Sequence, residues 1–192
     1  MGDLESRRGR MRVLVTWGSK RGGTEGIARM LGEALREAGL DVDILPLAKA
    51  AAAKAFDAAI VGGALYANRW HPHARRFVNR QETKLRDVPV WFFSSGPLDD
   101  SAERQVIPPV DQVRVLMDRV GAQGHATFGG RLAPDARGFP ASAMAKTRAG
   151  DWRRPERIRG WALEIARALP VARPGVAVTP PGRSPARLVA HG

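Results

Sequence analysis

Short apolar runs alternate with longer segments of helical periodicity along this 192-residue chain, and this alternation limits the fold more than any other feature. The apolar runs are candidate strands at 12–16, 41–46, 58–62, 88–93 and 124–128. The segments between them carry apolar side chains at the three- and four-residue spacing of amphipathic helices. These candidate helices are 23–38, 72–85, 109–120 and 155–169. The alternation predicts an α/β domain with a parallel sheet and helices on both faces.

Five strands in a domain of this size favour a three-layer sandwich whose parallel sheet has the strand order 2-1-3-4-5. Residues 41–46 alternate between apolar and polar side chains, which indicates a half-exposed strand near an edge. We expect the folded domain to span 12–169. Residues 1–11 and the Pro/Gly-rich tail 170–192 lack a periodic apolar pattern and are predicted to be disordered.

The composition narrows the classes of chemistry that are open to the chain. It contains no cysteine, which excludes disulfides, thiolate metal sites and thiol catalysis. No apolar run approaches the roughly 20 residues of a membrane span, and the first residues lack the apolar core of a secretory signal. A cytoplasmic protein is therefore expected.

The charge of the chain is strongly positive, at +12. Residues 1–11 hold three Arg against Asp3 and Glu5, and 171–192 hold three Arg and no acid, which leaves +8 on the predicted domain. A positive field of this size favours anionic ligands, peripheral contact with a membrane surface, or acidic partners. No stacking-aromatic motif accompanies it, so nucleic-acid binding is not expected.

The most informative segment is the glycine-rich turn between the first strand and the first helix. Its residues are Ser19, Lys20, Arg21, Gly22, Gly23 and Thr24. Unpaired backbone N–H groups and the positive end of a helix dipole make such a turn an anion site. We expect hydroxyls of Ser19 and Thr24 to add donors, and the two glycines to let the backbone curl around a phosphate.

Two common phosphate motifs are absent from this turn. A P-loop needs Lys directly before its Ser or Thr, whereas Gly23 precedes Thr24, and the dinucleotide pattern GxGxxG is missing. The segment 19–24 instead resembles the flavodoxin pattern [ST]-x-x-G-x-T, whose loop wraps the phosphate of FMN. A tight turn without a ligand is the alternative reading.

Two further segments fall where flavodoxins place their flavin-binding loops, after the third and fourth predicted strands. The first comprises Ala64, Leu65, Tyr66, Ala67 and Asn68, and the second comprises Ser94, Ser95, Gly96, Pro97 and Leu98. The resemblance, over about 12–169, implies a flavodoxin-like fold with bound FMN. It also implies that Tyr66 stacks on the flavin ring and that the second segment closes the ring's other side. A core or rim aromatic is the alternative for Tyr66.

Within this family, three stretches resemble the menaquinone-dependent protoporphyrinogen oxidase branch: 63–85, 128–132 and 150–162. That branch implies a role in haem biosynthesis, with an organic electron donor and a quinone acceptor. The short segment 133–149 departs from it, because the branch carries a longer basic and aromatic insertion there. The substrate is therefore open.

Other polar clusters are weaker candidates. His71 and His73 have the spacing of a metal pair, but no third ligand is near, and a solvent-facing helix start is the preferred interpretation. Asp99 and Asp100 are expected in turn or cap roles, with proton acceptance as the alternative. Arg69, Arg75, Arg76 and Arg80 form either a solvated helix face or a binding surface.

Three functions fit these patterns. The first is an FMN-dependent oxidoreductase, in which the flavin carries the chemistry and no catalytic side chain is identified. The second is an electron carrier whose basic surface docks acidic protein partners. The third is a flavodoxin-like module without catalysis. We favour the enzyme over the carrier.

Overall fold

The computed structural model describes residues 11–19, 22–53, 55–139 and 141–169. The tails 1–10 and 170–192, which the sequence predicts to be disordered, lie outside the described residues. Five parallel strands form the main sheet in the order β2-β1-β3-β5-β6. They are β1 (Arg12–Gly18), β2 (Asp41–Pro46), β3 (Ala58–Tyr66), β5 (Val90–Ser95) and β6 (Gly124–Phe128). The expected 2-1-3-4-5 order is confirmed, with β2 at an edge.

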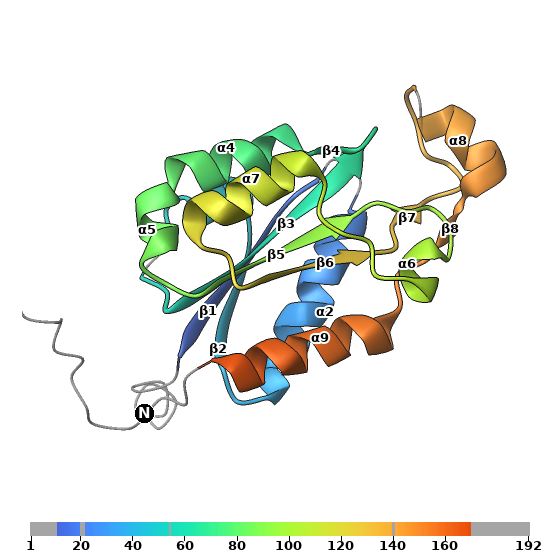
Figure 1. The fold of residues 1–192 in the computed structure, drawn as a ribbon. Helices are drawn as coiled ribbons and strands as arrows, with labels where there is room; N and C mark the ends of the chain where they lie inside the picture. Colours follow the sequence, from blue (N-terminus) through green and yellow to red (C-terminus); the bar gives the residue numbers. More distant parts are fainter. Residues whose placement is uncertain (1–10, 20–21, 54, 140, 170–192) are drawn as a thin grey trace, which may run out of the picture.

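Helices cover both faces of the sheet, as Figure 1 shows. One face carries α2 (Gly23–Glu37) and α9 (Pro155–Ala168). The other carries α3 (Leu47–Ala50), α4 (Pro72–Arg80), α5 (Glu82–Arg86) and α7 (Asp111–Val120). Among the described residues, no helix has both the length and the apolar character needed to cross a membrane.

Successive side chains of the buried strands point to opposite faces of the sheet, and this divides the core into two layers. In β1, Val13 and Val15 pack with α2 and α9, while Leu14 packs on the opposite side with α3 and α4. All three side chains are fully buried, which explains why a parallel strand reads as a continuous apolar run. The first helix ends before Gly39, whose φ of +92° is the left-handed conformation that glycine adopts readily.

Strand β3 is longer than the apolar run 58–62 indicates. It continues to Tyr66 and turns back into β4 (Arg69–Trp70), with Tyr66 paired to Arg69. Ala67 and Asn68 form the turn with φ of +48° and +57°, the signs that a two-residue type I′ hairpin requires. The usual Asn-Gly signal is absent, so the sequence did not reveal this hairpin.

Two element boundaries differ from the prediction for identifiable reasons. The expected helix 72–85 is interrupted at Gln81 and becomes α4 and α5, which allows Leu85 to be buried against α7. Strand β5 begins at Val90 rather than 88, because Pro89 has no N–H to donate, although its carbonyl accepts from Ala59 N at 3.0 Å.

Short elements that were not predicted lie at and beyond the carboxyl end of the sheet (Figure 1). They are α6 (Ser101–Arg104), β7 (Arg131–Leu132), α8 (Ala141–Arg148) and β8 (Gly150–Asp151). Strands β7 and β8 pair antiparallel as a separate two-stranded sheet. A small apolar cluster of Leu132, Ala141 and Ala145, with Leu98 against it, attaches α8 to this region.

Candidate functional site

The head of α2 lies at the carboxyl end of β1, where the sequence predicts an anion site. Gly22 precedes the helix with φ of +73°, and its carbonyl accepts from Gly26 N at 3.1 Å. Thr24 is 1% exposed, and its Oγ1 has no hydrogen-bond partner among the described residues. A buried hydroxyl without a partner is costly, so Thr24 Oγ1 is a candidate donor to a ligand. Ser19 is half-buried, and Lys20 and Arg21 lie outside the described residues.

Gly23 has a packing role that its sequence context does not indicate. A Cβ on Gly23 would lie 3.3 Å from the backbone N of Arg131 and 3.5 Å from its O, so the missing side chain makes room for β7. The contact of Gly23 with a phosphate stays a prediction, because the crowding concerns only the side of Gly23 that faces β7. A Cβ on Gly22 would have no heavy atom within 4 Å, and its contact with a phosphate also stays a prediction.

The second predicted segment lies mostly within strand rather than loop. Ala64 is buried in β3, Tyr66 ends the strand with 36% of its surface exposed, and Ala67 and Asn68 form the turn. A Cβ on Gly96 would lie 2.9 Å from Cδ1 of Leu65, so this segment and the third predicted segment meet directly. An exposed tyrosine at the carboxyl edge of the sheet is consistent with the predicted flavin contact.

The third predicted segment divides into two parts. Ser94 and Ser95 are buried in β5, and only Gly96, Pro97 and Leu98 form a loop. Gly96 N donates to Phe128 O at 3.2 Å, and Gly130 N donates to Pro97 O at 2.7 Å. The loop is thus fixed to the residues that follow β6.

These contacts connect all three predicted segments at the carboxyl ends of the parallel strands. Leu65 packs on Gly96, the 96–98 loop bonds to Gly130, and Arg131 packs on Gly23 at the head of α2. The connecting segment 128–132 was noticed in the sequence only for its resemblance, and its side chains were not assigned to the site. Its role depends on long-range packing, which no local pattern indicates.

His125 on β6 is a half-buried titratable residue that the sequence patterns do not single out. Its Nε2 lies 2.9 Å from Ser94 Oγ, and its Nδ1 has no hydrogen-bond partner among the described residues. Burial lowers the pKa of His125 from 6.5 to about 4, because the charged ring would lose hydration. The imidazole is therefore neutral at physiological pH.

The histidine pair near α4 corrects one expectation. His73 is exposed, but His71 is 2% exposed and is not solvent-facing. His71 precedes α4, and its Nδ1 accepts from His73 N at 3.3 Å, while a Cβ on Gly18 would lie 3.2 Å from the same nitrogen. No group of three or more metal-ligating side chains is found within the part of the chain that the structure describes.

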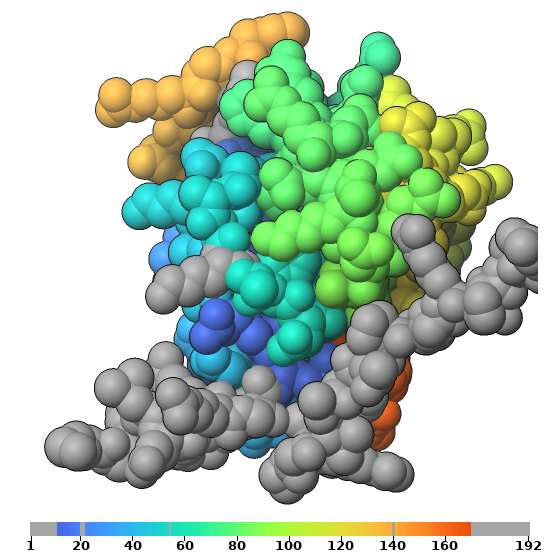
Figure 2. Space-filling model, turned by 90° about the vertical axis from the view of Figure 1, so that its left-hand side faces the viewer, coloured from blue at the N-terminus to red at the C-terminus, as the bar shows by residue number. Residues whose placement is uncertain are grey.

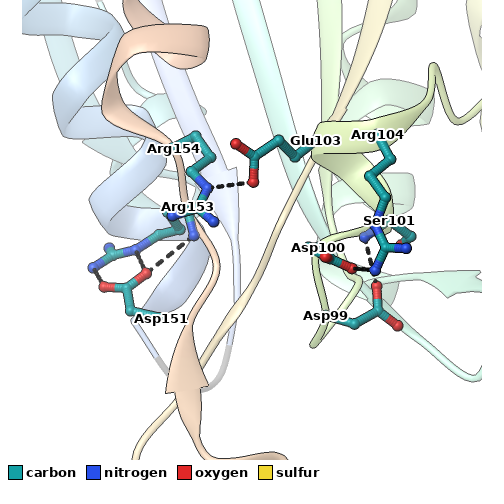
Figure 3. Close-up of polar contacts among 8 residues, drawn as sticks. All are labelled: Asp99, Asp100, Ser101, Glu103, Arg104, Asp151, Arg153 and Arg154. Atoms are coloured by element: carbon teal, nitrogen blue, oxygen red, sulfur yellow. Dashed lines mark hydrogen bonds and ion pairs between the residues drawn. The ribbon is translucent and has the colours of Figure 1, made fainter.

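Acidic residues near the third segment make structural contacts, as Figure 3 shows. Asp99 Oδ1 accepts from Ser101 N at 2.9 Å, and Asp100 pairs with Arg104. The preferred turn role of Asp99 is thus observed, and this hydrogen bonding with Ser101 lowers its pKa. Glu103 on α6 accepts from Arg154 Nε at 2.6 Å, which ties α6 to the residue before α9.

The basic residues of α4 and its preceding strand face outward. Arg69, Arg76 and Arg80 are exposed and Arg75 is half-buried, and none pairs with a described acid. In Figure 2 the green surface of α4 and α5 occupies the upper part of the face that is shown. This surface is available for an anionic partner.

Comparisons with known proteins agree with this architecture. A family model described as a flavodoxin domain matches residues 14–144. A search of curated proteins finds no match. Among solved structures, a variant of flavodoxin from Pseudomonas aeruginosa is 20% identical with a TM-score of 0.54, and covers 83% of this chain and 99% of that one. Oxidised flavodoxin 2 from Bacillus cereus is 19% identical with a TM-score of 0.55, covering 82% and 99%.

A larger protein shares the same fold. Rubredoxin oxygen:oxidoreductase from the anaerobe Desulfovibrio gigas is 16% identical with a TM-score of 0.54, over 86% of this chain and 38% of that chain. The present chain therefore spans about two fifths of that protein's length. Identities this low show the fold alone, whereas the family model matches more than half of the sequence. Together with the observed sheet order, this match shows that the chain belongs to the flavodoxin domain family.

Proposed function

We propose that this chain binds FMN at the carboxyl edge of its sheet, with the phosphate at the head of α2. The buried, unpartnered hydroxyl of Thr24 carries the proposal, because a phosphate oxygen is a partner of the right chemistry. The open left-handed turn at Gly22 and the positive end of α2 support it. The residues present therefore fit the group that the family resemblance implies.

Each of the three segments has a defined part in holding the cofactor. Thr24 and the first backbone N–H groups of α2 would donate to the phosphate, and Tyr66 would cover one side of the ring. The loop 96–98, held by its bonds to Phe128 and Gly130, would close the other side. When bound, FMN supplies the hydride and electron transfer, and the chain supplies binding, orientation and exclusion of water.

We further propose that the chain is an oxidoreductase that oxidises protoporphyrinogen or a similar organic donor, with quinone as the acceptor. The resemblance of 63–85 and 150–162 to the oxidase branch supports this proposal. The basic domain also supports it, because positive charge near a flavin favours the anionic reduced form. An electron carrier between proteins is the alternative, favoured by the uncompensated arginines of α4.

Anaerobic reduction of the FMN-loaded protein distinguishes the two functions. Protoporphyrinogen and reduced nicotinamides are each mixed with the oxidised protein, and the flavin absorbance is followed, then a menaquinone analogue is added. The enzyme predicts rapid bleaching by one donor and recovery with the quinone. Bleaching only when a reductase protein is present contradicts the enzyme and supports the carrier.

A further inference from the structure

The β7–β8 hairpin lies against the first turn of α2, which is the proposed phosphate end of the site. On one strand, the backbone of Arg131 occupies the space beside Gly23, with Arg131 Cβ 3.6 Å from a Cβ built there. Next to the other strand, the guanidinium of Arg153 occupies the space beside Gly26 so closely that a Cβ there would overlap its Nη1. Two arginines therefore flank one helix start.

Asp151 holds the guanidinium group of Arg153 in place. Arg153 Nε donates to Asp151 Oδ1 at 2.7 Å, Nη2 donates to Oδ2, and the backbone N of Arg153 also donates to Oδ1. This hydrogen bonding lowers the pKa of Asp151, so the carboxylate is ionised at neutral pH. The charge of Arg153 is thus compensated locally, and its side chain serves to hold β8 on α2.

Arg131 differs in that it acts on Asp151 only through longer-range attraction and not through an ion pair. It pairs across the hairpin with Asp151 in backbone register, its side chain is exposed, and it forms no ion pair with a described residue. The other charge in the first turn of α2 is Glu25, which is occupied by Arg29 through bonds of 3.0 and 2.8 Å. Beside the helix start, Arg131 therefore supplies a positive charge that no neighbouring acid neutralises by direct contact.

We propose that Arg131 is a phosphate-binding residue of the flavin site, presented to the head of α2 by the β7–β8 hairpin. The inference rests on the proposed function and deepens it. The ligand group is a phosphate monoester dianion, for which the guanidinium adds a full positive charge and a fork of N–H donors to the backbone N–H groups of the helix start. The hydroxyl of Thr24, buried and without a described partner, independently indicates a ligand at the same turn.

The test compares the affinities of two charge-removing variants for two flavins. FMN and riboflavin are titrated into the apoprotein by fluorescence quenching, with wild type, Arg131→Gln and the control Arg80→Gln on the opposite face of the sheet. We expect Arg131→Gln to weaken FMN binding about tenfold and to leave riboflavin binding within about twofold. Arg80→Gln should change neither affinity, and Arg131→Lys should lose less FMN affinity than Arg131→Gln.

Four outcomes decide the proposal. A loss confined to FMN supports it, and an equal loss for both flavins overturns it. A wild type that prefers FMN, with the preference intact in Arg131→Gln, overturns this inference while leaving the proposed function in place. A wild type that binds neither flavin, or both equally, overturns the proposed phosphate site and the inference with it. Thermal unfolding of each apoprotein identifies misfolded variants, and Arg131→Lys then provides the comparison.

Discussion

Mild acid should weaken this fold through His125 on β6. Burial lowers the pKa of His125 to about 4 in the folded protein, against 6.5 for an exposed ring. Well above about pH 6.5 the ring is neutral in both the folded and the unfolded chain and does not change the free energy of unfolding. As the pH falls below that value, His125 binds a proton in the unfolded chain but not in the folded chain, so the free energy of unfolding decreases.

The size of this effect follows from the shift. Each pKa unit is worth about 1.4 kcal/mol, which gives about 2 kcal/mol lost at about pH 5 and about 3 kcal/mol by about pH 4. Protonation would add a second ring N–H, whereas Ser94, at Nε2, is the only hydrogen-bond partner of the ring nitrogens among the described residues. Hydrogen bonds from Ser101 and Arg153 lower the pKa values of Asp99 and Asp151. Protonation of these two carboxylates therefore decreases the free energy of unfolding only below about pH 4.

Urea unfolding of wild type and His125→Gln between about pH 7 and pH 4.5 measures the effect. Glutamine keeps an amide beside Ser94 but does not titrate, so the difference in pH dependence between the two proteins isolates the ring. We expect the wild type to lose about 2 kcal/mol more than the variant over this range. Parallel pH profiles would refute the reasoning, as would a ring titration near 6.5 followed by NMR.

Three further substitutions test other parts of the structure. Thr24→Asp places a negative charge at the proposed phosphate, so FMN affinity measured by fluorescence should fall at least about 30-fold, or about 2 kcal/mol. Gly26→Ala should destabilise the wild type by overlap with Arg153, but stabilise Arg153→Ala by up to about 1 kcal/mol, because alanine is the better helix former. If the changes that Gly26→Ala and Arg153→Ala cause in the free energy of unfolding by urea were additive, that contact would be contradicted. Gly62→Ala should cost about 3 kcal/mol, because its Cβ would overlap the ring of Phe93, whereas Gly160→Ala, open on α9, should be neutral or stabilising.

The sequence predicted the long elements because each follows one period. Continuous apolar runs identified β1 and β5, and helical spacing identified α2 and α9, since burial in a sheet or on a helix face leaves those patterns. The strand order then followed from the number of strands together with the order that flavodoxin-like folds adopt. Boundaries were less certain, as the break at Gln81 illustrates, because no Gly or Pro marks it.

Contacts between distant segments were not predictable in the same way. The local pattern around Gly23 is that of a phosphate-binding turn, yet its missing side chain accommodates the backbone of Arg131, more than a hundred residues away. Likewise His71 is polar and adjoins a helix start, but in the folded chain Gly18 at the end of β1 and the ring of Tyr66 lie beside it. The 96–98 loop was identified by resemblance, whereas its hydrogen bond to Gly130 appeared only in the folded chain.

Comparison of FMN with riboflavin tests the central claim most directly. Purified wild-type protein is stripped of flavin, and each flavin is titrated separately by isothermal calorimetry at low and high salt. The proposed site predicts that FMN binds at least about tenfold more tightly than riboflavin, with a preference that decreases at high salt as charges are screened. Equal affinities, or no binding of either flavin, would contradict a phosphate site at the head of α2.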